Sequence, residues 1–334
     1  MMLRYLWLTF RPGQTLKPLL KLSSSLVLGL GIFFSQVFAP PPQAFAQSPK
    51  PESLLNLPNL SGLTWLEGGQ FLSVHDSKDK QGKKPAISLL TITDKQATWQ
   101  PLTLNWEKLG AKTDAPSDLE SITRIPRSHY LIAAESGYEQ TAQGRLFLLE
   151  WKQDALIPIA VINWPKNIRN IEGIAATELQ GKTYLLYGER VGKEGTTELC
   201  WSTLSLQPFR LGDCNLVRYP SPDPHPQFRA ISDLALDDQG NLYQASAYDP
   251  DQDNGPFASS VWQVGIFQLG EDGKPTIKPL AKPKPLAEIR GYKVEALTLR
   301  QTPKGQQVWI GTDDENFGGT IRLLPDLGLN LSSD

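Results

Sequence analysis

Acidic residues recur at two fixed places in a motif that is repeated along the chain. The motif is an apolar residue, often a glutamate, a small residue, an apolar residue and then Thr or Ala. A turn and a second apolar run follow, and that run ends on an acid. Carboxylates ligate hard cations such as Ca²⁺, and they also perform general acid–base catalysis. The motif glutamates are Glu120, Glu172 and Glu295, and the acids that end the second runs are Asp76, Glu135, Glu189, Asp249 and Asp313.

The motif glutamates stand in short runs that are apolar or small on both faces. In residues 171–175, Glu172 and Ile174 share one face, while apolar and small residues occupy the other. This pattern is typical of a strand that is buried on both sides. A buried carboxylate is costly unless it is paired, hydrogen-bonded or bound to a metal. Three roles are therefore open for these glutamates: metal ligation, acceptance of backbone N–H groups from a neighbouring strand, and direct acid–base catalysis.

Basic residues and one histidine lie next to the same motifs. Arg169, Arg229 and Lys293 stand just before the third, fourth and fifth copies, where they could bind a phosphate or carboxylate. The alternative is internal ion pairing with the acids, which the sequence favours for Arg190 because it follows Glu189. We expect Glu120, Glu172 and Glu295 to be catalytic, together with His75, which could be a general base because it precedes Asp76. The anion-binding candidates are Arg229, Lys293 and Arg169.

The repeat itself predicts the architecture that must position these residues. The second position of the motif falls at residues 61, 120, 172, 232 and 295. Each unit contains about four short strand-like runs, which predicts an all-β fold, a β-propeller with four-stranded antiparallel blades. Five copies predict five blades, and the longer units leave room for a sixth. A large β-sandwich is the alternative, although a sandwich does not require one motif to recur five times.

Antiparallel pairing of the first two strands would gather the acids at one place. The start of the first strand and the end of the second lie on the same face of the disc. We therefore expect the motif glutamates and the five acids that end the second runs to lie around one mouth of the central channel. The five acids are the candidate metal ligands, and Ca²⁺ is the expected cofactor. The propeller domain is expected to span residues 54–334, and residues 54–57 could provide an outer strand that closes the fifth blade.

The first 46 residues resemble an export signal. A basic leader without acids precedes an apolar stretch at residues 22–39, and Ala44, Phe45 and Ala46 form a small-x-small cleavage site. An uncleaved N-terminal anchor is the alternative. Residues 47–53 form a Pro-rich lead-in, and no later segment has the roughly 20 apolar residues of a membrane helix. We expect a periplasmic or extracellular protein.

The net charge limits the kinds of partner that are expected, and the two cysteines bear on a disulfide. Residues 1–46 contain four basic residues and no acids, so their removal changes the net charge from −2 to −6. This acidic balance argues against nucleic acid as a partner. Cys200 and Cys214 are the two cysteines, and we expect them to form a cross-strand disulfide in an exported protein. Two reduced thiols in the core are the alternative.

Three pairs of runs resemble the esterase-like, phytase-like β-propeller family of exported bacterial proteins. They are LESITRI with YLIAAESG, IEGIAAT with YLLYGER, and VEALTLR with VWIGTDDENFGGTIRLL. The resemblance covers roughly residues 55–325 and implies an acidic central site, phosphoesterase activity and calcium. The chain departs from the six-bladed phytase propellers in its five repeats. It also carries Ser61 and Ser232 at the glutamate position of the first and fourth motifs, where Asp233 follows Ser232.

These observations predict a calcium-assisted hydrolase of phosphate or carboxylate esters, acting on a small anionic ligand at the acidic mouth. We expect the protein to be a monomer. The alternative function is a non-enzymatic propeller that binds a ligand or a protein and uses the carboxylates as a structural ring. A quinone-dependent dehydrogenase is a more distant alternative, because the chain has no cofactor motif for it.

Overall fold

A computed structural model of the chain describes most of the residues after position 56. The described residues are 57–77, 85–93, 97–110, 114–136, 143–166, 168, 170–190, 195–225 and 227–324. The expected export signal at residues 1–46 and the lead-in at 47–53 lie outside this part. Within it, no helix has the length and apolar character needed to cross a membrane.

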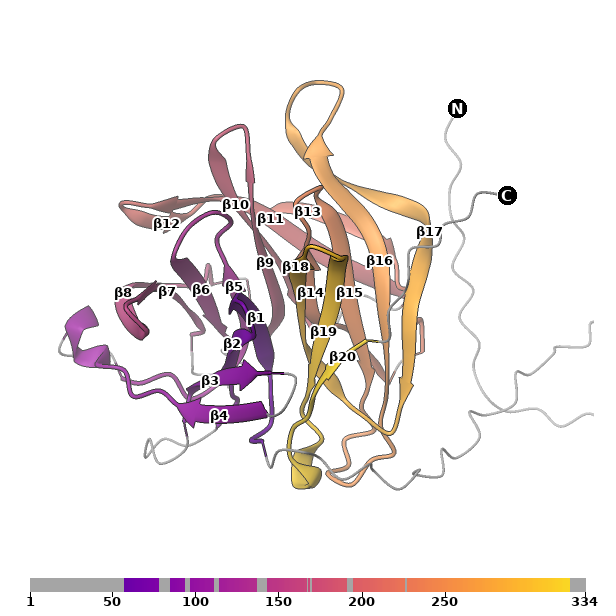
Figure 1. Cartoon of the computed structure of the whole chain (residues 1–334). Coiled ribbons are helices and arrows are strands. Elements are labelled where there is room, and N and C mark those ends of the chain that lie inside the picture. Colours follow the sequence, from indigo (N-terminus) through magenta and orange to yellow (C-terminus); the bar gives the residue numbers. More distant parts are fainter. Residues whose placement is uncertain are drawn as a thin grey trace, which may run out of the picture. The chain divides into compact units, whose positions relative to one another are not determined.

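The described chain is a five-bladed β-propeller, as the repeat predicts (Figure 1). Blade 1 contains β1 (Gly62–Glu67), β2 (Gln70–Val74), β3 (Ile87–Ile92) and β4 (Ala97–Pro101). Blade 2 contains β5 (Leu119–Arg124), β6 (Tyr130–Glu135), β7 (Arg145–Lys152) and β8 (Ala155–Asn163). Blade 3 contains β9 (Ile171–Leu179), β10 (Lys182–Glu189), β11 (Thr196–Leu206) and β13 (Asn215–Pro220), with the short β12 (Phe209–Leu211) also paired to β11.

Blades 4 and 5 complete the disc. Blade 4 contains β14 (Phe228–Leu236), β15 (Asn241–Tyr248), β16 (Ala258–Leu269) and β17 (Pro275–Arg290). Blade 5 contains β18 (Val294–Thr302), β19 (Gly305–Thr312) and β20 (Ile321–Leu323) among the described residues. Leu57 adds one antiparallel bridge to Gly319, and the rest of the expected closing segment, residues 54–56, is outside the described part. Two short 3₁₀ turns are η1 (Trp106–Leu109) and η2 (Glu315–Phe317).

Five hydrophobic clusters hold the blades together, one at each interface. The fourth motif residue of each blade packs between its own blade and the preceding one, as Ile122 does between blades 1 and 2. Leu63 packs in the same way with Ala296 and Trp309 of blade 5, which closes the ring. The apolar residue of the motif is therefore the inter-blade core residue.

The small residue of the motif lets the innermost strands approach one another closely. A Cβ atom built on Gly62 would lie 2.7 Å from the Cα atom of Ser121, and one on Gly173 would lie 2.9 Å from the carbonyl carbon of Asp233. Side chains at this level also join the blades. Ser121 Oγ donates to Asp233 Oδ1 at 2.8 Å, and Asp233 Oδ2 accepts the Leu297 N–H at 2.6 Å. These contacts close the channel near its middle.

The Thr of the motif forms a second set of inter-blade bonds. Thr123 Oγ1 accepts the Ala176 N–H at 3.2 Å, and Thr298 Oγ1 accepts the Trp65 N–H at 3.1 Å. The Thr position of the motif thus accepts backbone N–H groups of the neighbouring blade.

The expected disulfide between Cys200 and Cys214 is confirmed, with 5.3 Å between the Cα atoms. It links β11 to the segment that leads into β13 in blade 3.

Candidate functional site at the acidic mouth

The three motif glutamates stand at β-bulges. On β5, Leu119 pairs with Glu135 and Ser121 with Ala134, so that Glu120 has no partner across the strand. The β9–β10 and β18–β19 pairings shift in the same way at Glu172 and Glu295. A bulge bends the strand and redirects one side chain. We call the end of the channel that carries these three glutamates the acidic mouth; it lies on the side of η2 in Figure 1.

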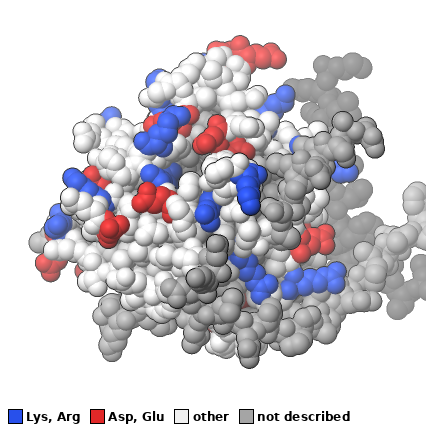
Figure 2. All heavy atoms as spheres, in the orientation of Figure 1, with Lys and Arg blue, Asp and Glu red and all other residues white. Residues whose placement is uncertain are grey.

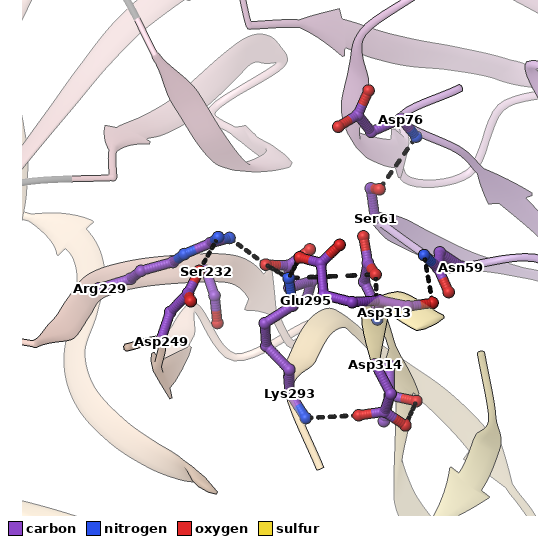
Figure 3. Close-up of polar contacts among 12 residues, drawn as sticks. Asn59, Ser61, Asp76, Arg229, Ser232, Asp249, Lys293, Glu295, Asp313 and Asp314 are labelled. Carbon is purple, nitrogen blue, oxygen red and sulfur yellow. Dashed lines mark hydrogen bonds and ion pairs between the residues drawn. The ribbon is translucent and has the colours of Figure 1, made fainter. Parts of the chain in front are cut away.

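Arg229 on β14 binds carboxylates from three blades. Its Nη1 atom lies 3.5 Å from Glu172 Oε2. The same atom bonds to Glu295 Oε1, and Nη2 bonds to Asp249 (Figure 3). Arg190 adds a second cation, 3.2 Å from Asp249 and 3.6 Å from Glu172. The ion pairing that the sequence favoured for Arg190 therefore involves the next blade and the motif glutamate of its own blade.

Lys293 forms a similar centre in blade 5. Its side chain is only 1% exposed, and its ammonium bonds to Glu315 and lies 3.5 Å from Glu295 and 4.0 Å from Asp313. The Phe257 ring, with its centroid 5.8 Å from Nζ, covers another side of the ammonium. Burial lowers the pKa of Lys293, but Glu295 and Asp313 outweigh this effect and raise it above its usual value. The lysine stays charged and neutralises this part of the mouth.

The opposite side of the mouth has a different charge balance. One carboxylate oxygen from each of Asp76, Asp118 and Glu120 lies within 4.8 Å of the others. Burial and the charges of Glu172, Asp118, Asp76 and Glu295 raise the pKa of Glu120 well above its usual value. Among the described residues, no Lys or Arg lies within ion-pair distance of Glu120. A divalent cation would compensate this group of carboxylates.

Two further carboxyl groups hold their protons near neutral pH. Burial raises the pKa of Glu172 to about 8, although Arg229 opposes the shift. Burial and Glu295 raise the pKa of Asp313 to about 8 as well, against the effect of Lys293. Groups that titrate in this range can both donate and accept protons at physiological pH, which is what acid–base catalysis needs.

Buried polar atoms without a hydrogen-bond partner also occur at this mouth. In the described part of the chain they include Glu172 Oε1, Arg229 Nε and Asn59 Oδ1. Asn59 is tied to the mouth because its Nδ2 atom donates to the Glu315 carbonyl oxygen at 3.3 Å. Such atoms are rare in folded proteins and often belong to a functional site. The mouth therefore offers acceptor and donor positions to a ligand.

The other expected site residues are placed as follows. Glu135 accepts two bonds from Arg145, at 2.5 and 2.9 Å, and one from the Ser117 N–H. Glu189 ends β10, where its charge helps to raise the pKa of Tyr187 in the core between blades 2 and 3. Arg169 lies outside the described residues.

His75 is buried inside blade 1. Its Nδ1 atom donates to the Asn59 carbonyl oxygen at 2.6 Å, so the neutral ring uses Nε2 to accept from Ser88 Oγ at 2.9 Å. Burial lowers the pKa of His75 to about 4, and the bond to Asn59 opposes this shift only in part. Both ring nitrogens are occupied in a neutral ring, and the histidine anchors the chain segment that leads into β1.

The serines at the glutamate position bond to backbone groups at the same mouth. Ser61 Oγ accepts the Asp76 N–H at 3.1 Å, and Ser232 Oγ donates to the Val294 carbonyl oxygen at 2.7 Å. Asp233 does not take the place of a motif glutamate, because its carboxylate lies in the closed middle of the channel. Burial raises the pKa of Asp233 well above its usual value, even though Ser121, Leu234 and Leu297 donate to it.

Two residues of the acidic mouth were not predicted from the sequence. Asp118 lies two positions before Glu120, where alternation along a strand would have brought it to the same face, and this was the available signal. Asn59 stands directly before the first motif, at the position that Asp118 occupies in the second copy and Asn170 in the third, and this recurrence was the available signal.

Comparison with known proteins reveals likeness in structure only. No protein-family model and no curated protein sequence matches the chain. An endo-arabinase of Bacteroides thetaiotaomicron is 11% identical, over 81% of this chain and 94% of that one, with a TM-score of 0.49. An arabinanase of Bacillus subtilis is 11% identical, over 80% and 94%, with a TM-score of 0.43. A glucose dehydrogenase is 12% identical, over 82% and 98%, with a TM-score of 0.43. These likenesses concern the fold and say nothing about a substrate.

Proposed function

We propose that the acidic mouth is the site of a cation-assisted hydrolase that cleaves phosphate or carboxylate esters, and that Ca²⁺ is its cation. The observation that carries the proposal is Glu120, a partly buried carboxylate whose pKa is raised most by burial and by four acidic neighbours. Its oxygen is grouped with those of Asp76 and Asp118. The all-oxygen donor set fits a hard cation, and Ca²⁺ accepts carboxylates and amide oxygens in irregular geometry.

The division of charge around the mouth supports an anionic substrate. Arg229, Lys293 and Arg190 occupy the side formed by blades 3, 4 and 5, opposite the carboxylate group of blades 1 and 2. An ester with a phosphate or carboxylate group would be oriented between these two sides. When bound, a cation would polarise the ester oxygen and lower the pKa of an attached water.

Glu172 is the proposed proton donor. Because its pKa is raised to about 8, it is largely protonated at neutral pH, and the proton can pass to the oxygen of the leaving group. Arg229 and Arg190 would stabilise the carboxylate that remains. Glu295 is held by Arg229 and Lys293, and we assign it the role of fixing both cations.

The ion pairs on the cationic side favour a second candidate, a binding propeller without catalysis. Arg229 alone bonds or lies close to Glu172, Glu295 and Asp249, as a purely structural ring would require. In this case the mouth would bind a cation or an anion and leave it unchanged.

A hydrolysis assay separates the two candidates. The purified protein is treated with EDTA, and cleavage of p-nitrophenyl phosphate and p-nitrophenyl butyrate is then measured with and without CaCl₂. We expect calcium-dependent cleavage that Glu172→Gln abolishes without loss of calcium binding in calorimetry. Asp238→Asn, at the other end of the channel, is the control. Calcium binding without cleavage of either ester would favour the binding propeller, and no calcium binding would contradict the cation site.

Export is a further part of the proposal. The basic and apolar leader of residues 1–46 and the Cys200–Cys214 disulfide support it. Mass spectrometry of the protein isolated from its native cells would detect an N-terminus at Gln47 if the leader is cleaved.

A further inference from the structure

The far end of the channel contains a cavity that the acidic mouth does not use. Its volume is about 380 Å³, and it is lined by the innermost strands of all five blades where these strands leave the disc. Volumes of this size are typical of pockets for small organic ligands.

The closed middle of the channel separates this cavity from the acidic mouth. Ser121 of blade 2 bonds directly to Asp233 of blade 4, and Gly62 and Gly173 bring neighbouring strands into contact at the same level. A molecule in the cavity therefore cannot reach Glu120 or Glu172 through the channel. The two ends can act as independent sites.

The cavity combines apolar side chains with a fixed cation. Leu236, Leu299 and Trp65 are partly exposed and line it together with Arg124. The indole N–H of Trp65 donates to the Gly68 carbonyl oxygen at 3.1 Å, which holds the ring beside the cavity.

Arg124 differs from the cations of the acidic mouth in its partners. Its Nε atom donates to the Ser128 carbonyl oxygen at 2.8 Å, and its Nη1 atom donates to the Leu66 carbonyl oxygen. Within the described part of the chain no carboxylate pairs with it. Two carboxylates also line the cavity: Asp237 already accepts bonds from Gln239, Asn241 and Tyr243, and Asp238 is exposed to solvent. The guanidinium is positioned by carbonyl groups, and its charge is left for a ligand.

We infer that this cavity is a second ligand site, which binds a small organic anion with an aromatic or aliphatic body. The apolar body would lie against the leucines and the Trp65 ring, and its carboxylate or sulfonate would bond to Arg124. Charge-assisted bonds of this kind are about twice as strong as neutral ones, so the anionic group would set the preference.

The test uses anilinonaphthalene sulfonate, an aromatic sulfonate that fluoresces in apolar surroundings, with the full-length folded protein. We expect saturable binding, displaced by benzoate but not by benzyl alcohol. Arg124→Gln should weaken binding about tenfold. The matched control is Arg127→Gln on the same rim, because Arg127 is 78% exposed and paired with Glu178; its effect should be less than about twofold.

A second variant keeps the test decisive if Arg124→Gln does not fold. Trp65→Ala removes the indole from the cavity wall and should also reduce binding of the dye. EDTA and CaCl₂ should leave dye binding unchanged, because the middle of the channel is closed. Full binding in either folded variant, displacement by the neutral alcohol as effective as by benzoate, or no saturable binding would overturn the inference.

Discussion

Arg229 Nη1 on β14 lies 3.5 Å from Glu172 Oε2 on β9, so a guanidinium of blade 4 stabilises a bulged glutamate of blade 3. The same atom bonds to Glu295 of blade 5. One cation thus connects three blades at the acidic mouth and compensates the charge of the carboxylates that it contacts.

Removal of Arg229 should therefore destabilise the protein strongly. Arg229→Gln leaves Glu172, Glu295 and Asp249 buried with less compensation, and breaking a buried pair in this way costs about 3–5 kcal/mol. Chemical denaturation of the purified variant would measure the loss. In the background of Glu295→Gln the same substitution should cost less, because one of the abandoned carboxylates is already neutral. A loss below about 0.5 kcal/mol, as for an ordinary surface residue, would contradict this account.

The pH dependence of stability should report the raised pKa of Glu172. The folded state holds a proton on Glu172 up to about pH 8, whereas the unfolded chain releases it near its model value of 4.5. The free energy of unfolding in EDTA should therefore decrease as pH rises through this window. The lowered pKa of His75 makes the free energy of unfolding increase with pH, but only between about pH 4 and its model value of 6.5. Denaturation at several pH values from about 6.5 to 8 avoids the contribution of His75.

Glu172→Gln is the variant for this measurement. Its stability should fall less steeply than that of the natural protein over the same range, and the remaining slope should come from Asp313, Glu120 and Asp233. Equal slopes in the two proteins would show that Glu172 is already ionised below neutral pH.

Gly62 should not tolerate a side chain. A Cβ atom there would lie 2.7 Å from Ser121 Cα and 2.8 Å from Val74 Cγ2, and the first of these atoms belongs to the backbone of the next blade. Gly62→Ala should therefore lower the free energy of unfolding by about 1–3 kcal/mol, the usual cost of overpacking. Gly195→Ala tests a different cause, because its Cβ meets no atom and only its φ of 70° is strained. Unchanged stability in Gly62→Ala would mean that the blades can move apart at this level.

The disulfide should stabilise blade 3 without affecting the mouth. Cys200 and Cys214 are 14 positions apart, and closing a loop of this size contributes roughly 3 kcal/mol in the chain-entropy model. The double variant Cys200→Ala/Cys214→Ala should lose about this amount in chemical denaturation. Its calcium affinity in calorimetry should match that of the natural protein. A loss of affinity in a folded double variant would contradict the claim that the disulfide does not affect the acidic mouth.

The architecture could be predicted from the sequence because each innermost strand meets the same packing demands. Ile122 and Leu63 fill equivalent inter-blade positions, and Gly62 and Gly173 equivalent close contacts, so the motif must recur once per blade. The bulge at Glu120 could not be predicted, since a residue that is skipped in the pairing leaves no mark in the alternation of side chains.

Equivalent acids also receive different partners, which the sequence pattern does not reveal. Glu135 and Asp313 both follow a second apolar run, but Arg145 on β7 binds Glu135 twice, while Asp313 faces Lys293 at 4.0 Å. Arg145 comes from the third strand of its blade, whereas Lys293 comes from the position just before the first strand. Which carboxylate is neutralised is therefore decided by the three-dimensional arrangement of the cations.

The most direct test of the central claim is a thermal melt of the purified protein in EDTA and then in excess CaCl₂. A ligand that binds only the folded state adds about 2.7 kcal/mol of stability at a concentration one hundred times its Kd. We predict a higher Tm with calcium, which Glu120→Gln abolishes and Asp238→Asn retains. An unchanged Tm in protein shown to be free of metal, or a calcium shift that persists in Glu120→Gln, would contradict the assignment of the cation site to Asp76, Asp118 and Glu120.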